Sequence, residues 1–395
     1  MSAHAKAQPV GGPIWTRAFR ILTALLALSA VLMVWRWIVG LGPATNLSDG
    51  YPWGLWIAFD VVTGTALGCG GYAMAFLVYI FNKGQYHPLV RPAVLTSALG
   101  YSMAALAINL DVGRPLYLYK IPVMPHWWNL NSALLEVAIC VMAYVAVLWI
   151  ELSPAFFERW EAGPEGFLKK IAGTFHPIVK KLMVPLLAVG ILLPTMHQSS
   201  LGALMLLAGE KLHGLWHTPL LPLLFLISCV GMGYAVVAFE GTLASRFFHR
   251  QRETGMLASL GRVTGWVVVG WAVLRLADIV LRGKLGLLFS FEMYGFFFWL
   301  EMALAVAGGL MLLTGSRFTE AGQFIASMMI VVSGSLYRID TYLVAYNPGP
   351  NWSYFPAVPE QIITLGVVAL EIMLYVILVK TFPILSGTTS ARAAK

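Results

Sequence analysis

Apolar runs of about twenty residues recur ten times along this chain of 395 residues. A helix rises about 1.5 Å per residue, so such a run can cross the roughly 30 Å hydrocarbon core of a bilayer. Only 11% of the residues are charged, against about 25% in an average soluble protein. The sequence therefore predicts an all-α, polytopic membrane protein. The predicted spans are residues 18–39, 53–80, 89–110, 131–151, 182–208, 219–243, 262–281, 291–314, 321–343 and 360–380.

The distribution of lysine and arginine predicts how these helices are oriented. Ten spans place both termini on one side of the membrane, and 18 of the 26 basic residues lie in segments on that side. Because basic residues accumulate in cytoplasmic loops, both termini are expected in the cytoplasm. Residues 1–17 and 381–395 are then cytoplasmic tails, and residues 18–380 form the integral membrane domain.

Several other classes of protein are disfavoured. The sequence pI of about 9.4 would suit nucleic acid, but the basic residues lie in short loops, where they set topology, so no nucleic-acid partner is expected. Cys69, Cys140 and Cys229 lie in apolar runs without a CxxC motif or a nearby histidine, so no iron–sulfur cluster is expected in this chain. The run from Ile21 to Val39 is too long for a signal peptide and is expected to remain as the first helix.

Four consecutive predicted helices bring polar side chains to one depth near the outer face. Asp60 lies about seven residues into helix 2, roughly 10 Å below the interface. Asp111 and Arg114 follow helix 3, Glu136 begins helix 4, and His197 lies in the outer part of helix 5. Charged groups deep in a bilayer cost at least about 2.5–3.5 kcal/mol and commonly mark functional sites. The shared depth predicts one site.

Two interpretations of this site remain open. In the structural one, Asp60 pairs with Arg114 and Glu136 with His197, and the pairs only hold helices together. In the functional one, the same side chains line a ligand pocket near Trp53 and Trp56 of helix 2, with Trp127 and Trp128 close by. Each interpretation predicts contacts between helices, but only the second needs polar atoms directed at a ligand.

A quinone suits such a pocket. Its tail partitions into the bilayer, its carbonyl oxygens need hydrogen-bond donors, and its reduction consumes two electrons and two protons. His197 and Asp60 are the expected proton donors, because a buried carboxyl group or imidazole can be protonated and refilled from water. Whether the quinone is menaquinone or ubiquinone is left open. Of eight histidines, only His197 lies well inside a span, so no haem is expected.

The remaining polar residues receive structural interpretations. Arg275 with Asp278, and Arg338 with Asp340, are expected to form ion pairs that stabilise the second half of the chain. The outer loops 111–130 and 344–359 are rich in aromatic residues and proline, which suits either an interfacial belt or a docking surface for a partner protein.

Four stretches carry a family resemblance: "PWGLWIAFDVVTGTALGCGGYA", "NKGQYHPLVRPAVLTSALGYSMAALAINLDVGRP", "NSALLEVAICVMAYV" and "LLPTMHQSSLGAL". They resemble the NrfD/polysulfide-reductase membrane subunits, and in particular the HybB-type membrane subunits of periplasmic [NiFe] hydrogenases. "YRIDTYLVAYNPG" and "YFPAVPE" extend the resemblance over nearly the whole chain.

The resemblance implies NrfD-like helix bundles, with helices 2–5 (about 53–208) holding the quinone site and helices 6–9 (about 219–343) forming a second bundle. It implies a quinone-reactive subunit of the bacterial inner membrane that has no redox cofactor of its own. Its partners would be a ferredoxin-like four-cluster iron–sulfur subunit and the hydrogenase small and large subunits on the periplasmic side. In this sequence the family's quinone pocket falls on Trp53, Trp56, Asp60, Asp111, Arg114, Glu136 and His197.

Three rival functions follow from the same residues. A secondary transporter or ion channel would need inverted repeats and a site near the midplane, and neither is evident in the sequence. A purely structural anchor would leave quinone turnover unchanged when Asp60 or His197 is altered. A molybdenum-type reductase could replace the hydrogenase as the partner, and only the HybB-type resemblance argues against that alternative.

Overall fold

The computed structural model describes residues 7–248, 254–290 and 292–385. Parts of both predicted tails, and the first residue of the predicted eighth helix, therefore lie outside the described residues. Within this part of the chain, ten helices are long and apolar enough to cross a membrane. They span Arg17–Val39, Trp56–Ile80, Gly84–Asp111, Ala133–Glu161, Phe167–Leu206, Leu221–Phe247, Thr254–Leu281, Met293–Leu313, Glu320–Val344 and Val358–Thr381. The all-α, ten-helix prediction is confirmed.

The helix bounds differ most from the predicted ones where a helix continues beyond its apolar run into polar residues. The fifth spanning helix, α8, begins at Phe167 rather than 182 and continues for 40 residues to Leu206. The added residues 167–181 carry four lysines, which is why hydropathy alone did not include them. The helix keeps Pro177, Pro185 and Pro194 inside it.

The second spanning helix is not a regular α-helix. It consists of a π-helical segment η1 (Trp56–Thr63), the short helices α3 (Gly64–Leu67) and α4 (Gly70–Ala75), and a second π-helical segment η2 (Phe76–Ile80). A turn at Gly68 and Cys69 separates α3 from α4. π-Helical turns are rare and occur frequently at functional sites. The irregular backbone, which the apolar run did not predict, therefore makes this helix a candidate scaffold for a site.

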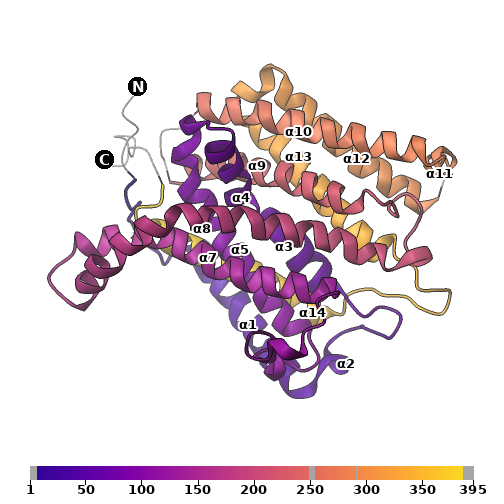
Figure 1. Cartoon of the computed structure of the whole chain (residues 1–395), viewed down its shortest axis with the longest axis horizontal. Helices are drawn as coiled ribbons and strands as arrows, with labels where there is room; N and C mark the ends of the chain where they lie inside the picture. Colours follow the sequence, from indigo (N-terminus) through magenta and orange to yellow (C-terminus); the bar gives the residue numbers. More distant parts are fainter. Residues whose placement is uncertain (1–6, 249–253, 291, 386–395) are drawn as a thin grey trace.

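The remaining helices pack around this irregular one. Figure 1 shows α1 (Arg17–Val39) and α14 (Val358–Thr381) side by side, and α7 (Ala133–Glu161) and α8 as a hairpin that extends beyond the others. The helices α10 (Thr254–Leu281), α12 (Met293–Leu313) and α13 (Glu320–Ile339) form a second group. Between the groups lies α9 (Leu221–Phe247), which contacts α4, α8, α10 and α13. Another helix, α5 (Val90–Asp111), contacts η1, α4, α7 and α14.

The two ends of the bundle differ in character. At the tail end, the backbone N–H of Val10 donates to the carbonyl oxygen of Val379 at 3.1 Å, so the two described ends of the chain meet. The opposite end, here called the loop end, carries the connections 112–132, 207–220 and 345–357. Short helices α2 (Leu41–Ala44), α6 (Lys120–Val123) and α11 (Leu285–Leu288) lie in connecting segments.

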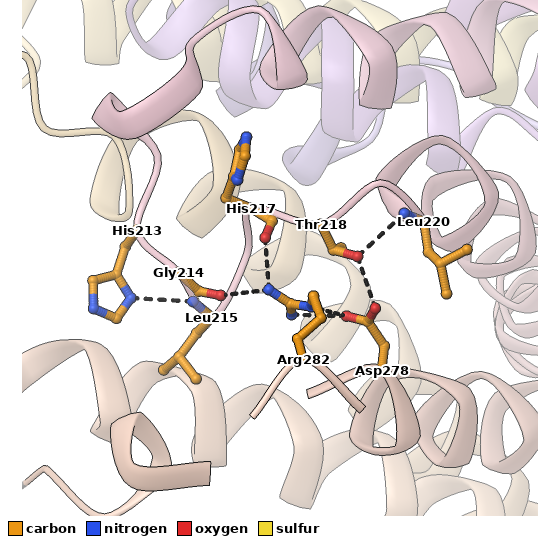
Figure 2. Close-up of polar contacts among 8 residues, drawn as sticks. All are labelled: His213, Gly214, Leu215, His217, Thr218, Leu220, Asp278 and Arg282. Atoms are coloured by element: carbon orange, nitrogen blue, oxygen red, sulfur yellow. Dashed lines mark hydrogen bonds and ion pairs between the residues drawn. The ribbon is translucent and has the colours of Figure 1, made fainter. Parts of the chain in front are cut away.

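One of these connections is fixed to the end of α10, as Figure 2 shows. Arg282 Nη1 donates to the carbonyl oxygens of Gly214 at 2.9 Å and His217 at 2.7 Å. The Thr218 hydroxyl donates to Asp278 Oδ1 at 2.8 Å, and Asp278 also forms an ion pair with Arg282. The loop is thus held by charged side chains, and Asp278 pairs with Arg282 instead of Arg275.

Candidate functional site

The π-helical segment η1 carries the two most deeply placed of the predicted site residues on helix 2. Trp56 is 1% exposed and Asp60 is 6% exposed. The indole Nε1 of Trp56 has no hydrogen-bond partner among the described residues, although the ring is packed among Met33, Leu110 and Ile363. A buried N–H without a partner costs about 1–3 kcal/mol, so this donor is an expected anchor for a ligand acceptor atom.

Asp60 has its partners on the last helix. The Thr364 hydroxyl of α14 donates to Asp60 Oδ2 at 2.8 Å. Glu371, about two turns further along α14, interacts electrostatically with Asp60. No pairing between Asp60 and Arg114 is present in the part of the chain that the structure describes. The carboxyl group is therefore held by a neutral donor and has no basic partner there, which leaves it free to carry a proton.

The residues that lead into η1 are held by the end of the ninth spanning helix and by the loop 345–357. Trp53 Nε1 donates to the carbonyl oxygen of Tyr342 at 3.0 Å. The Tyr354 hydroxyl accepts from the Leu55 N–H at 2.7 Å and donates to Glu360 Oε2 at 2.5 Å. Burial raises the pKa of Tyr354 above its usual value, which keeps this hydroxyl protonated as a donor. Trp53 is thus a structural contact whose N–H is already used.

Asp111 and Arg114 lie in different surroundings although they are close in sequence. Asp111 ends α5, and its buried Oδ1 has no hydrogen-bond partner among the described residues. It interacts electrostatically with Arg36 of α1, whose Nη2 donates to the Val112 carbonyl oxygen at 2.7 Å. Arg114 is exposed in the loop, and its side chain forms no hydrogen bond or ion pair with a described residue. Asp111 thus interacts with Arg36 of α1 and not with Arg114, its neighbour in the sequence.

His197 belongs to a second buried set, which includes residues of α3 and α5. Its Nε2 lies 3.0 Å from the Tyr101 hydroxyl and 3.0 Å from Gln198 Nε2, while Nδ1 faces the Leu193 carbonyl oxygen at 3.3 Å. A carbonyl oxygen can only accept, so we assign the proton of the neutral ring to Nδ1. Nε2 then accepts from Tyr101, and Gln198 also donates to Thr65 Oγ1 at 3.1 Å.

Glu136 stands apart from His197. It lies in the first turn of α7, is partly exposed, and its side chain forms no hydrogen bond or ion pair with a described residue. The predicted pairing of Glu136 with His197 is therefore absent, and Tyr101 occupies that position.

The structure thus distributes the predicted residues over two buried sets. One contains Trp56, Asp60 and Asp111 between η1, α5, α1 and α14. The other contains His197 with Thr65, Tyr101 and Gln198 between α3, α5 and α8. Among the described residues, no hydrogen bond or ion pair joins Asp60 to His197.

The predicted pairs in the second half are wrong. Arg275 forms its ion pair with Glu301 of α12, and Trp216 Nε1 donates to the same carboxylate at 3.1 Å. Arg338 donates to the Phe225 carbonyl oxygen at 3.0 Å and to Ser228 Oγ at 3.2 Å, not to Asp340. The spacing of three residues between Arg275 and Asp278 is compatible with contact on one helix, but that of two between Arg338 and Asp340 is not.

Sequence reasoning missed the partners that hold the site residues. It does not single out Thr364 or Tyr101, because a lone hydroxyl in an apolar run gives no local signal, and it does not connect Glu371 with Asp60. Thr364 lies 304 residues from Asp60, so only the packing of α14 against η1 places them together. Gln198 was visible in the polar "HQSS" run, and it lies beside His197 in the structure. No cluster of three or more His, Cys, Asp or Glu side chains suited to a metal ion occurs in the described ranges.

Comparison with known proteins agrees with this architecture. The family model described as polysulphide reductase, NrfD, matches residues 43–346. A probable Ni/Fe-hydrogenase 2 b-type cytochrome subunit of Escherichia coli is 38% identical over 386 residues, which cover 96% of this chain and 95% of the relative. A menaquinone reductase integral membrane subunit of Nitratidesulfovibrio vulgaris is 32% identical over 246 residues, covering 60% of this chain and 56% of the relative.

A more distant relative extends the range of complexes. One subunit of the selenate reductase of Mesobacillus selenatarsenatis is 22% identical over 378 residues, covering 84% of this chain and 86% of the relative. The family model covers well over half of the chain, and the Escherichia coli relative aligns along nearly its full length. The resemblance predicted from the sequence is confirmed, and the chain belongs to the NrfD polysulphide reductase family of membrane proteins.

Proposed function

We propose that this chain is the quinone-reactive membrane subunit of a [NiFe] hydrogenase complex. It would receive electrons from H2 oxidation through an iron–sulfur subunit and pass them to the quinone pool. The likeness to a hydrogenase 2 membrane subunit over nearly the whole chain supports a hydrogenase as the partner complex. The likeness to a menaquinone reductase subunit supports a quinone as the electron acceptor.

The observation that carries this proposal is the pair formed by Trp56 and Asp60. Both side chains are buried, both lie on the π-helical segment η1, and the Trp56 N–H has no partner among the described residues. A quinone carbonyl oxygen is an acceptor and would take this N–H, while Asp60 lies one turn away as an acid. A donor and an acid at one depth are what a quinone needs as it gains electrons and protons.

His197 would take part in proton transfer during the same reaction. The neutral ring accepts at Nε2 from the Tyr101 hydroxyl, so Tyr101 can pass a proton to His197 or take one from it. Because all partners of His197 are buried side chains or backbone, a proton held there is shielded from bulk water. The Asp60 and His197 sets would act at separate positions along helix 2, at η1 and at α3.

A b-type haem does not fit the residues around His197, in spite of the word cytochrome in the relative's name. Nδ1 faces the Leu193 carbonyl oxygen, and Nε2 is shared by Tyr101 and Gln198. Iron needs a ring nitrogen with a free lone pair, and the one on Nε2 is already used. Electrons are proposed to reach the quinone directly from the partner's iron–sulfur cluster.

The loop end is the proposed docking face for that iron–sulfur subunit. Large apolar side chains are exposed there on the loops 112–132 and 345–357, including Leu116, Trp127 and Phe355. Patches of this kind commonly mark protein interfaces. The excess of lysine and arginine at the tail end supports a cytoplasmic position for both termini, and the loop end would then face the periplasm from a bacterial inner membrane.

The test is H2-dependent quinone reduction in membranes that carry Asp60→Asn. Hydrogenase turnover with an artificial dye reports assembly, and Asp49→Asn, an exposed aspartate at the same end, is the matched control. We expect quinone reduction to fall about a hundredfold in Asp60→Asn, with dye turnover and the Asp49→Asn variant unchanged. Unchanged quinone reduction in Asp60→Asn would contradict the site and favour a purely structural anchor.

The same assay separates the hydrogenase from a molybdenum-type reductase as partner. If the partner is a hydrogenase, the complex isolated with this chain will oxidise H2 with the dye as electron acceptor. If the complex isolated with this chain lacks hydrogenase activity and instead reduces an oxyanion with quinol, the family placement stands and the proposed partner is wrong. The likeness to a selenate reductase subunit is the reason for testing an oxyanion as substrate.

A further inference from the structure

Two of the three cysteines meet where helix 2 packs against α9. Cys69 lies in the turn between α3 and α4, and Cys229 lies on α9, and both are 0% exposed. They belong to one contact cluster with Ala66, Tyr72 and Met232. Both thiols are free, and they lie close enough to interact electrostatically. Two helices from different parts of the chain therefore present a pair of thiols to each other.

The backbones of the two helices are in direct contact at this crossing, one helical turn from Cys229. Gly233 follows Cys229 by one helical turn, so both face the same side of α9. A Cβ placed on Gly233 would lie 2.6 Å from the carbonyl oxygen of Cys69, so the two main chains are in direct contact there. Disulfides need Cα atoms about 4.4–6.8 Å apart, and small residues such as Gly233 allow transmembrane helices to approach closely.

A buried cation faces the same thiols. Arg338 is 0% exposed and forms no ion pair with a described residue. Its Nη2 is held by the Phe225 carbonyl oxygen and Ser228 Oγ, whereas its Nε and Nη1 have no partner in the described part of the chain. The guanidinium interacts electrostatically with both Cys69 and Cys229. A buried charge without a counter-ion is costly, and a thiolate is the anion this position can supply.

The thiol pair is also connected to His197. The Tyr101 hydroxyl lies 3.5 Å from Cys69 Sγ and 3.0 Å from His197 Nε2. A proton that leaves Cys69 thus has an adjacent hydroxyl and imidazole to accept it. Cys140, the third cysteine, is also buried but lies on α7, outside the cluster that holds Cys69 and Cys229.

We propose that Cys69 and Cys229 form an oxidisable dithiol, with Arg338 favouring its thiolate and a quinone as the oxidant. Two S–H bonds break and one S–S bond forms, and the two electrons and two protons released convert one quinone to quinol. The choice of quinone as the oxidant rests on the proposed function of this chain. The disulfide would fix the turn between α3 and α4 to α9 and would remove the thiol neighbour of Tyr101.

The first test uses the purified complex and the small-molecule thiol oxidant diamide. After treatment, the protein is denatured, free thiols are alkylated, and digested peptides are identified by mass spectrometry. We expect a linked peptide that contains Cys69 and Cys229, reversed by dithiothreitol, and still formed in Cys140→Ser. It should be absent from Cys69→Ser and from Cys229→Ser. Complete alkylation of both thiols after diamide treatment of the native complex would overturn the proposal.

A second arm replaces diamide with a water-soluble short-chain quinone and withholds H2. The same linked peptide is expected. Its absence, with diamide still effective, would overturn the quinone as oxidant and leave the dithiol itself standing. Because the diamide arm does not involve quinone, loss of H2-dependent quinone reduction in the Asp60→Asn complex would bear on the proposed function alone.

The role of Arg338 is tested by the rate of linkage. Arg338→Lys keeps a cation and should form the disulfide at a rate near that of the native chain. Arg338→Met removes the charge and should form it about tenfold more slowly, because less thiolate is present. Equal rates for the lysine and methionine variants would exclude this role for Arg338. If the methionine variant does not assemble, the pH dependence of linkage in Arg338→Lys, compared with the native chain, gives the same comparison.

Discussion

The Thr364 hydroxyl donates a hydrogen bond of 2.8 Å to Oδ2 of Asp60, across 304 residues of sequence. This contact ties the last transmembrane helix to the π-helical start of the second, at the depth where Trp56 leaves its N–H unpaired among the described residues. The carboxyl group is therefore positioned by a neutral donor from α14. It follows that α14 takes part in the proposed quinone site, which the sequence assigns to helices 2–5 alone.

Replacing Thr364 tests that contribution. Thr364→Val keeps the shape of the side chain and removes the donor, so Asp60 loses the hydrogen bond that holds Oδ2. We expect kcat/KM for quinone to fall about tenfold, the equivalent of roughly 1.4 kcal/mol. Thr364→Ser, which keeps the hydroxyl, should stay close to the native chain. Equal activity of the valine variant would show that Asp60 is positioned by the backbone of η1.

Tyr101 should matter for a different reason. Tyr101→Phe removes the hydroxyl between Cys69 Sγ and His197 Nε2 without changing the ring. We expect the rate of quinone reduction to fall at saturating quinone, with little change in KM, because a proton relay acts in turnover and not in binding. Steady-state kinetics with dye turnover as the assembly control will check this. A raised KM at constant kcat would instead place Tyr101 in quinone binding.

The buried ion pair in the second half is expected to act on stability. Glu301→Gln leaves Arg275 buried without its anionic partner, and breaking such a pair costs about 3–5 kcal/mol. The apparent Tm of the detergent-purified complex should fall by several degrees. Glu165→Gln is the control, because the Glu165 side chain is 84% exposed where it pairs with Lys169, and exposed pairs contribute little. Equal losses in both variants would contradict the assigned difference.

The sequence predicted the number of helices, but not which side chains meet between them. Apolar runs of fixed length predicted the ten helices, because the bilayer sets the length of each one. Depth along those helices also placed Asp60 and His197 away from the membrane surface, since depth depends only on the distance from a helix end. The rotation of each helix was not predictable, because the apolar residues around it face lipid and protein alike.

Rotation explains the errors at particular residues. Arg275 and Asp278 are three residues apart and could have paired, but Arg275 faces Glu301 on α12 while Asp278 faces Arg282. The sequence places Asp111 near Arg114, yet the nearer charge is Arg36 from the first helix. The π-helical turns of η1 shift the register of Trp56 and Asp60 relative to a regular α-helix, and no residue type in the run signals that shift.

The loop 207–220 is expected to respond to pH through His213. This side chain stacks on Tyr294 with ring centroids 4.3 Å apart, and burial lowers its pKa below the ordinary value of about 6.5. The opened loop binds a proton at a higher pH than the folded loop does, so folding of the loop is favoured above pH about 6.5 and is weakened as the pH falls below it.

Hydrogen exchange of residues 212–217 measures this effect. Protection should decrease between about pH 6.5 and pH 5.5 after correction for the intrinsic exchange rate. His213→Phe keeps the stacking on Tyr294 and cannot titrate, so its protection should be independent of pH over this interval. The same decrease in the phenylalanine variant would assign the pH response to another group in the loop.

Two glycines of α8 should respond in opposite directions to alanine. A Cβ at Gly202 would lie 2.7 Å from the Leu221 carbonyl oxygen and 2.8 Å from Pro222 Cα, so Gly202→Ala must push α9 away from α8. Nothing lies within 4 Å of a Cβ placed at Gly173 in the same helix, so Gly173→Ala should gain the helix propensity of alanine, up to about 1 kcal/mol. Thermal unfolding should therefore show a lower apparent Tm for Gly202→Ala and an equal or higher one for Gly173→Ala.

His197 lies just over one turn from Gly202 on this helix. We therefore also expect the Gly202→Ala complex to lose more of its quinone reduction than of its dye turnover. Retention of both activities and of the native Tm in Gly202→Ala would mean that α8 and α9 can separate without disturbing the His197 set.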